Sequence, residues 1–189
     1  MTIRSIWAAL VLAALSVASP IAAQGPDVLS RVVEETDGTR TLIHEATIDA
    51  PVDAVWATLS TADGWKAWGP REAWFDFRIG GSIETSYVAG AAPGDAQNIQ
   101  HRILAYVPER MIALEVIKVP EGAFEPGVLD GMWGVYELEP LENGKTRLRI
   151  LGLGYKSDET SSRILEFFKS GNAYSIRMLE QNLKQAGGQ

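Results

Sequence analysis

The chain has 189 residues, no cysteine, 46% hydrophobic residues and a formal net charge of −7. The lack of cysteine excludes structural disulfides and a cysteine-anchored lipoprotein, and a net negative charge without any basic block argues against nucleic acid or anionic lipid as a partner. The length suits one domain with its own hydrophobic core.

Residues 1–23 have the three-part plan of a secretory signal. Arg4 precedes an apolar run from Ile6 to Ala18, and small residues follow around Ala22 and Ala23. Ser and Pro residues, Pro20 among them, interrupt the run before the roughly 20 residues needed to cross a bilayer. We expect cleavage after Ala18 or Ala23, export to the periplasm or out of the cell, and no stable membrane insertion afterwards.

Residues 24–38 form an N-terminal extension that precedes the main domain. Asp37-Gly38 separates two β-favouring runs, and Asp-Gly between such runs is typical of a hairpin turn. The extension can therefore add a strand to the domain that we expect over residues 39–186.

A sharp change from strand to helix is predicted at TIDAPVDAVW, residues 47–56. Pro51 suits the first turn of a helix, where its missing N–H costs nothing, and Asp49 is a suitable cap. Apolar residues then recur at helical spacing up to Leu59. A second short helix is expected over residues 62–68.

Turn signals divide the middle of the chain into further strands. Gly80-Gly81, Val107–Arg110 and Asn143-Gly144 each separate two strand-like runs, and Asn-Gly is a strong hairpin signal. The longest connection, residues 119–132, mixes Pro, Gly and acidic residues with apolar ones. Long connections often cover ligand sites, and we expect this one to lie at the mouth of a cavity.

A long amphipathic helix is predicted near the C-terminus, over about residues 160–185. Its apolar stripe has a period of 3.6 residues and is interrupted by Asn172. The fold class that follows is α+β: a curved antiparallel sheet of six to seven strands, wrapped around this helix in a helix-grip arrangement, with two short helices after the first core strand. A curved sheet around one helix is expected to leave a cavity between them.

Five segments in order resemble the START-like (helix-grip, SRPBCC) superfamily, and within it the proteins named after the activator of Hsp90 ATPase homologue 1. They read IDAPVDAVWATLSTADGWKAWGP, FDFRIGGSIE, RILAYVPERMIALE, NGKTRLRI and a terminal long helix. The resemblance covers roughly residues 39–185 and implies the helix-grip fold. It does not select a function, because this superfamily includes lipid carriers, receptors, cyclases and chaperone cofactors.

Aromatic residues and the two histidines are the candidates for ligand contact. Trp56 and Trp65 are expected in the core, whereas Trp68 and Trp74 flank a Gly-Pro turn and are placed to line a cavity mouth. His44 and His101 both alternate with apolar residues, which is more typical of a hydrogen-bonded core histidine than of a catalyst. The candidate ligand-binding residues are Trp68, Trp74, Tyr87, His101, Trp133, Phe168 and Asn172.

No cofactor or metal is expected, since the two histidines are far apart in sequence and no carboxylates have ligand spacing. No nucleophile elbow, phosphate loop or dinucleotide fingerprint is present. Three functions stay open. We favour a non-enzymatic carrier or sensor of a small hydrophobic molecule. The alternatives are a cyclase- or dehydratase-like enzyme that uses a cavity histidine, and a protein-interaction module related to Hsp90 activators.

Overall fold

The computed structural model describes residues 27–187, so the predicted signal segment lies outside the described residues. In chain order the elements are β1 Leu29–Glu34, β2 Arg40–Ile48, α1 Val52–Ser60, α2 Ala62–Trp65, the 3₁₀ turn η1 Lys66–Trp68, β3 Glu72–Phe75, β4 Ser82–Ser86, β5 Ile99–Val107, β6 Met111–Lys118, β7 Trp133–Pro140, the 3₁₀ turn η2 Glu142–Gly144, β8 Thr146–Tyr155 and α3 Glu159–Gly187.

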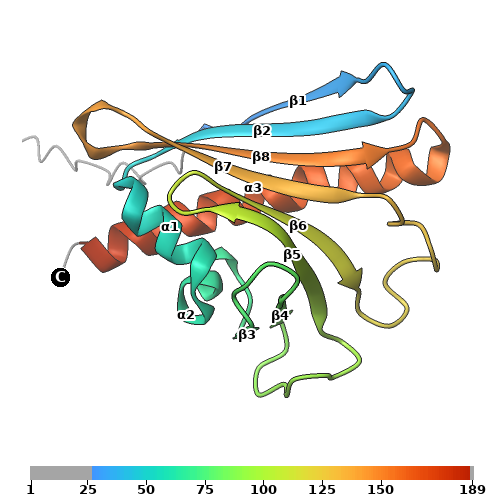
Figure 1. Cartoon of the computed structure of the whole chain (residues 1–189), viewed down its shortest axis with the longest axis horizontal. Coiled ribbons are helices and arrows are strands. Elements are labelled where there is room, and N and C mark those ends of the chain that lie inside the picture. The colour runs from blue at the N-terminus through green and yellow to red at the C-terminus, as the bar shows by residue number, and fades with distance from the viewer. Residues whose placement is uncertain (1–26, 188–189) are drawn as a thin grey trace, which may run out of the picture.

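All eight strands form one antiparallel sheet in the order β1-β2-β8-β7-β6-β5-β4-β3. Figure 1 shows α3 running along one face of this sheet, with α1 and α2 grouped near its C-terminal half. The α+β fold class predicted from the sequence, including the two short helices after the first core strand, is confirmed. The sheet has eight strands instead of six to seven, because the N-terminal extension supplies β1, which pairs with β2.

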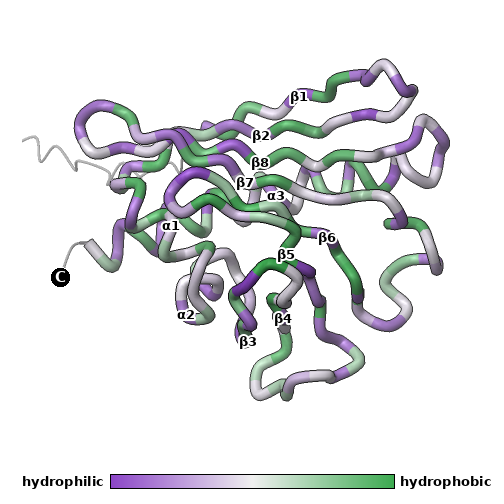
Figure 2. Tube along the Cα trace, viewed as in Figure 1, coloured by the Kyte–Doolittle hydropathy of each residue, from purple (hydrophilic) through white to green (hydrophobic). Residues whose placement is uncertain are grey.

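The predicted turns join the strands that they were expected to join. Between β7 and β8, Asn143 and Gly144 both have positive φ, 63° and 70°, as a tight turn requires. The last pair of this ladder is Pro140 with Thr146, so the connection comprises residues 141–145 and is longer than two residues. The Asp37-Gly38 connection is longer than the two-residue turn that the sequence suggests, since the last pair of the β1–β2 ladder is Glu34 with Arg40. In Figure 2, hydrophobic and hydrophilic residues alternate along the strands, as expected for a sheet with one buried face.

The change from strand to helix occurs where Pro51 predicts it, but the cap is different. Pro51 itself occupies the N-cap position of α1, and no side chain caps the helix there. The expectation that Asp49 is the cap is wrong. Its carboxylate instead lies 3.5 Å from Nζ of Lys145, which lies in the connection between β7 and β8. Proline ends the strand and begins the helix without help from a cap, because its fixed φ suits both roles.

The apolar stripe of α3 forms the centre of the molecule. Ile176 and Leu179 are fully buried and Leu165 is 3% exposed. The helix lies closest to β2, β8 and η1, where its stripe meets apolar residues from the inner face of the sheet, such as Leu148 and Ile150. Contact along only part of the sheet leaves the inner face of β5 and β6 more distant from α3.

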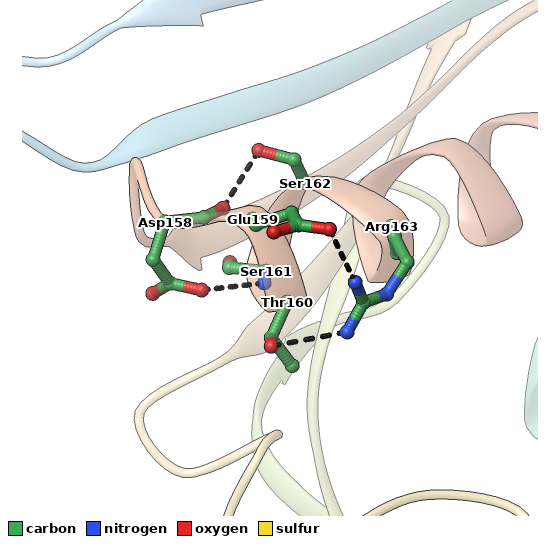
Figure 3. Close-up of polar contacts among 6 residues, drawn as sticks. All are labelled: Asp158, Glu159, Thr160, Ser161, Ser162 and Arg163. Atoms are coloured by element: carbon green, nitrogen blue, oxygen red, sulfur yellow. Dashed lines mark hydrogen bonds and ion pairs between the residues drawn. The ribbon is translucent and has the colours of Figure 1, made fainter.

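A cap fixes the start of α3 (Figure 3). The Asp158 carboxylate accepts a hydrogen bond from the backbone N–H of Ser161 at 2.8 Å, and the Ser162 hydroxyl donates to the Asp158 carbonyl at 2.7 Å. Arg163 also pairs with Glu159, one turn earlier, at 2.8 Å. The cap satisfies N–H groups that the first helical turn leaves free, and thereby sets which residues of α3 face the sheet.

Shortening a buried side chain of this stripe is expected to destabilise the protein strongly. Leu179→Ala removes apolar volume at a position with no exposed surface and should lower the free energy of unfolding by about 2–5 kcal/mol in urea denaturation. Gln181→Ala, at an exposed position of the same helix, is the control and should change it by less than about 0.5 kcal/mol. Equal effects of the two changes would show that α3 does not pack as described.

Candidate functional site

A cavity of about 480 Å³ lies between α3 and the inner face of the sheet from β4 to β8. Its walls also include α2, η1 and the loop over residues 119–132. A smaller cavity of about 90 Å³ adjoins it and shares seven of its lining residues. The larger volume falls within the roughly 300–1,000 Å³ of typical small-molecule sites.

Most of the predicted ligand-binding residues meet at these cavities. Five of them line the larger one, namely Trp68, Tyr87, His101, Phe168 and Asn172. Trp133 lines the smaller cavity, which His101, Phe168 and Asn172 also line. Residues that lie up to 104 positions apart in sequence, from Trp68 to Asn172, are thus brought together by the helix-grip arrangement.

Trp74 lines neither cavity, so the expectation that it lies at the mouth is wrong. In β3, Ala73 and Phe75 belong to the core, and successive side chains of a strand point to opposite faces. Trp74 therefore shares the outer face with Glu84, its partner across the β3–β4 ladder. Proximity to the Gly-Pro turn suggested the cavity, but strand alternation decides the direction of the side chain.

Of the two histidines, His101 lines the cavities and His44 does not. His44 is fully buried, and its Nδ1 shares a 2.8 Å hydrogen bond with the Ser30 hydroxyl on β1. This is the hydrogen-bonded core histidine that the apolar alternation predicts. His101 lies beside Trp65, with ring centroids 6.2 Å apart, and its Nδ1 is buried without a hydrogen-bond partner among the described residues.

Burial holds the ionisable side chains of the cavity in their neutral forms. Loss of hydration lowers the pKa of His101 to about 4, an effect that the backbone of Ile83 partly offsets. The same cause raises the pKa of Tyr136 and Tyr155 well above the ordinary value of a phenol.

Sequence reasoning missed several lining residues. Tyr136 lines both cavities, and Trp65, which the sequence assigned to the core, lines the larger one as well. The signal for Tyr136 was present, since it alternates with the acidic residues Glu137 and Glu139 and is two positions from the buried Leu138. That pattern places Tyr136 on the inner face.

The loop over residues 119–132 forms one wall of the larger cavity, as its length and composition led us to expect. Phe124 and Leu129 line the cavity. Phe124 also packs against two rings of α3, with centroid distances of 5.5 Å to Phe167 and 6.4 Å to Phe168. This aromatic cluster connects the β6–β7 loop with the helix.

Residues 27–187 show neither a metal-binding cluster nor a helix that could span a membrane. No group of three or more His, Asp or Glu side chains there is arranged to bind a metal ion. None of the helices in that range has the length and apolar character needed to cross a membrane.

Comparisons with known proteins agree with the fold. Residues 49–184 match the family model described as Activator of Hsp90 ATPase homolog 1-like protein. No curated protein matches the chain. Among solved structures, Ms6760 from Mycobacterium smegmatis has a TM-score of 0.62 and 21% identity, over 85% of this chain and 99% of that one.

Two further solved structures have a similar fold. CalU16 from Micromonospora echinospora has a TM-score of 0.58 and 22% identity, over 85% of this chain and 84% of that one. The di-domain ARO/CYC BexL from the BE-7585A biosynthetic pathway has a TM-score of 0.59 and 18% identity, over 77% of this chain and 46% of that one. At these identities the likeness shows the fold alone.

Both histidines are expected to stay neutral until strongly acidic pH. Each has a pKa near 4 in the folded protein, against 6.5 ordinarily. Between these values the unfolded chain binds protons that the folded protein does not, so stability falls as the pH drops from about 6.5 towards 4.

Titration of the imidazole C2–H resonances by ¹H NMR checks this directly, with His44→Gln used to assign the two signals. Neither resonance should reach its midpoint above pH 5. A midpoint near 6.5 for His101 would mean that its ring is solvated and not enclosed by the cavity wall.

Proposed function

The chain belongs to the family of Activator of Hsp90 ATPase homolog 1-like proteins, and from that premise we propose that it binds a small hydrophobic molecule between the sheet and α3, as a non-enzymatic carrier or sensor. The observation that carries this proposal is the cavity of about 480 Å³ with a largely apolar and aromatic lining. Sites of this volume and composition are typical of small-molecule binding. The sequence of residues 1–23 supports a location in the periplasm or outside the cell.

An enzyme of the cyclase kind is the second candidate, and His101 is the observation that favours it. Its imidazole lies in the cavity and is neutral, as a general base must be before it accepts a proton. However, a base is most effective when its pKa lies near the working pH, and a pKa of about 4 makes His101 a weak one. The likeness to the ARO/CYC protein supports the fold on which such chemistry occurs elsewhere, and not a reaction of this chain.

The outer face of the sheet gives less support to the third hypothesis, that the protein is a protein-interaction module. Its charged side chains already pair across strands: Arg147 with Glu139 at 2.6 Å, and Arg149 with Glu137 at 2.7 Å. A protein partner would have to separate or desolvate such pairs, which offsets the attraction it gains.

Native mass spectrometry of the freshly purified protein tests the proposal. A carrier should retain a hydrophobic molecule that is released unchanged on denaturation, and the stripped protein should bind the neutral dye N-phenyl-1-naphthylamine. Ser175→Trp places an indole in the lining of the larger cavity and should weaken dye binding at least about 10-fold, since it fills space that the dye needs. The matched change Ser170→Trp, at an exposed position of α3, should leave binding unchanged. Equal dye binding by both variants would locate the site elsewhere.

Ligand binding is also expected to order the loop over residues 119–132. Phe124 and Leu129 reach the cavity from this loop, so contact with a bound molecule should slow its backbone amide exchange about 10-fold or more. Hydrogen exchange with and without saturating dye measures this, with the β7–β8 turn at residues 141–145 as an internal control. Unchanged exchange over 119–132 would remove the loop from the binding site.

A further inference from the structure

The lining of the two cavities carries no charged side chain. None of the described residues that line either of them is Asp, Glu, Lys or Arg, although such residues make up 22% of the chain. A carboxylate or ammonium group bound there would lose its hydration without gaining a counter-ion, which is strongly unfavourable.

Two of the lysines that are adjacent in sequence to lining residues have partners elsewhere. Lys118, which precedes the lining residue Val119, donates to the carbonyl oxygens of Gly94 and Asp95 at 3.0 and 2.7 Å. Lys169, which follows the lining residue Phe168, lies 3.3 Å from Glu166. Neither ammonium group is placed to neutralise an acid inside the cavity.

Three polar side chains lie where the two cavities adjoin. His101 from β5, Tyr136 from β7 and Asn172 from α3 line both cavities. Polar groups close to this region are satisfied within the protein: Trp68 Nε1 donates to Thr58 Oγ1 at 3.1 Å, and the Asn182 amide donates to the Ala67 carbonyl at 2.8 Å.

Asn172 differs from Asn182 on the same helix in this respect. No hydrogen bond found within residues 27–187 involves the Asn172 amide or the Tyr136 hydroxyl, whereas the Asn182 amide has one. Among the polar atoms of the three side chains that line both cavities, His101 Nδ1 is fully buried and has no partner. Buried polar groups are rarely left without partners. An amide that interrupts an apolar helix stripe and faces a cavity can donate to, and accept from, a polar group of a bound molecule.

We propose that the cavity selects an uncharged molecule, such as an alcohol, ketone or amide with a hydrophobic skeleton, and that Asn172 and Tyr136 bind its polar group. This inference rests on the proposed function and adds the chemical class of the ligand. Asn172 supplies both a donor and an acceptor, and Tyr136 supplies a hydroxyl. The aromatic and aliphatic lining encloses the hydrophobic skeleton. A carboxylic acid or an amine with the same skeleton is excluded because it is charged.

The neutral state of His101 agrees with this selection. It is the one cavity-lining side chain described that could become a cation near neutral pH, and burial lowers its pKa to about 4. At pH 7.5 it therefore offers no positive charge to an acid.

Competition for the bound dye N-phenyl-1-naphthylamine tests the selection with four probes of one chain length: 1-decanol, 2-decanone, decanoate and decylammonium, at pH 7.5. The alcohol and the ketone should displace the dye, and both ions should be on the order of 100-fold weaker, because each loses hydration without a partner. If decanoate or decylammonium competes within about 3-fold of decanol, the selection is refuted while binding of a hydrophobic molecule stands. If the protein binds neither the dye nor any probe, the proposed function itself fails.

Two substitutions test the role of Asn172. Asn172→Leu keeps the side-chain size and removes the amide, so 1-decanol should bind about 3- to 10-fold more weakly. Asn172→Asp adds a carboxylate and should strengthen decylammonium at least about 10-fold while decanoate stays excluded. Asn182→Leu, which removes an amide already paired within the protein, should leave the ranking of the four probes unchanged. An unchanged ranking and unchanged decanol affinity in Asn172→Leu would overturn the assignment of Asn172, and circular dichroism confirms that each variant is folded.

Discussion

The whole arrangement depends on how one long helix meets a sheet that bends away from it. The apolar stripe of α3 packs closely on β2 and β8 and against η1, and Ile176 and Leu179 are fully buried there. A helix cannot follow the sheet across its full width, so the strands on the other side of the sheet face α3 over a gap. Trp65, Trp68 and Tyr136 narrow that gap with large rings but do not fill it. The cavity is therefore a geometric result of the fold, and its chemistry is set by the side chains around it.

Much of this fold can be read from local signals in the sequence. Asn143-Gly144 predicts a tight turn because few residues tolerate the two positive φ angles that it requires, and Pro51 predicts a helix start because its ring fixes φ. The 3.6-residue stripe predicts the buried face of α3. Each of these signals acts within a few residues, so tertiary contacts have little opportunity to override it. The failure of Asp49 to cap α1 was not predictable in the same way, since the contact between its side chain and Lys145 spans nearly a hundred residues.

The site is harder to predict, because it depends on which face of each strand points inward. His44 and His101 have similar apolar alternation, yet only His101 reaches the cavity, owing to the position of its strand opposite the gap. The β5–β6 ladder has register shifts next to His101 and again beyond Ile103. Such shifts change which face of the sheet a side chain points to, and alternation in the sequence does not reveal them. Trp74 was misplaced for the related reason that its neighbours Ala73 and Phe75 take the inner face. Tyr136 was overlooked although its own alternation was regular.

The loop that carries Phe124 joins β6 to β7, two strands already paired directly with each other from Met111–Glu137 to Glu115–Trp133. Its residues take no part in that ladder, so its length and composition can vary without disturbing strand pairing. The residues that pair β6 with β7 and the residues of the loop between them are thus separate stretches of chain. A substitution at Phe124 or Leu129 would therefore alter the wall of the cavity without changing a residue of the β6–β7 ladder.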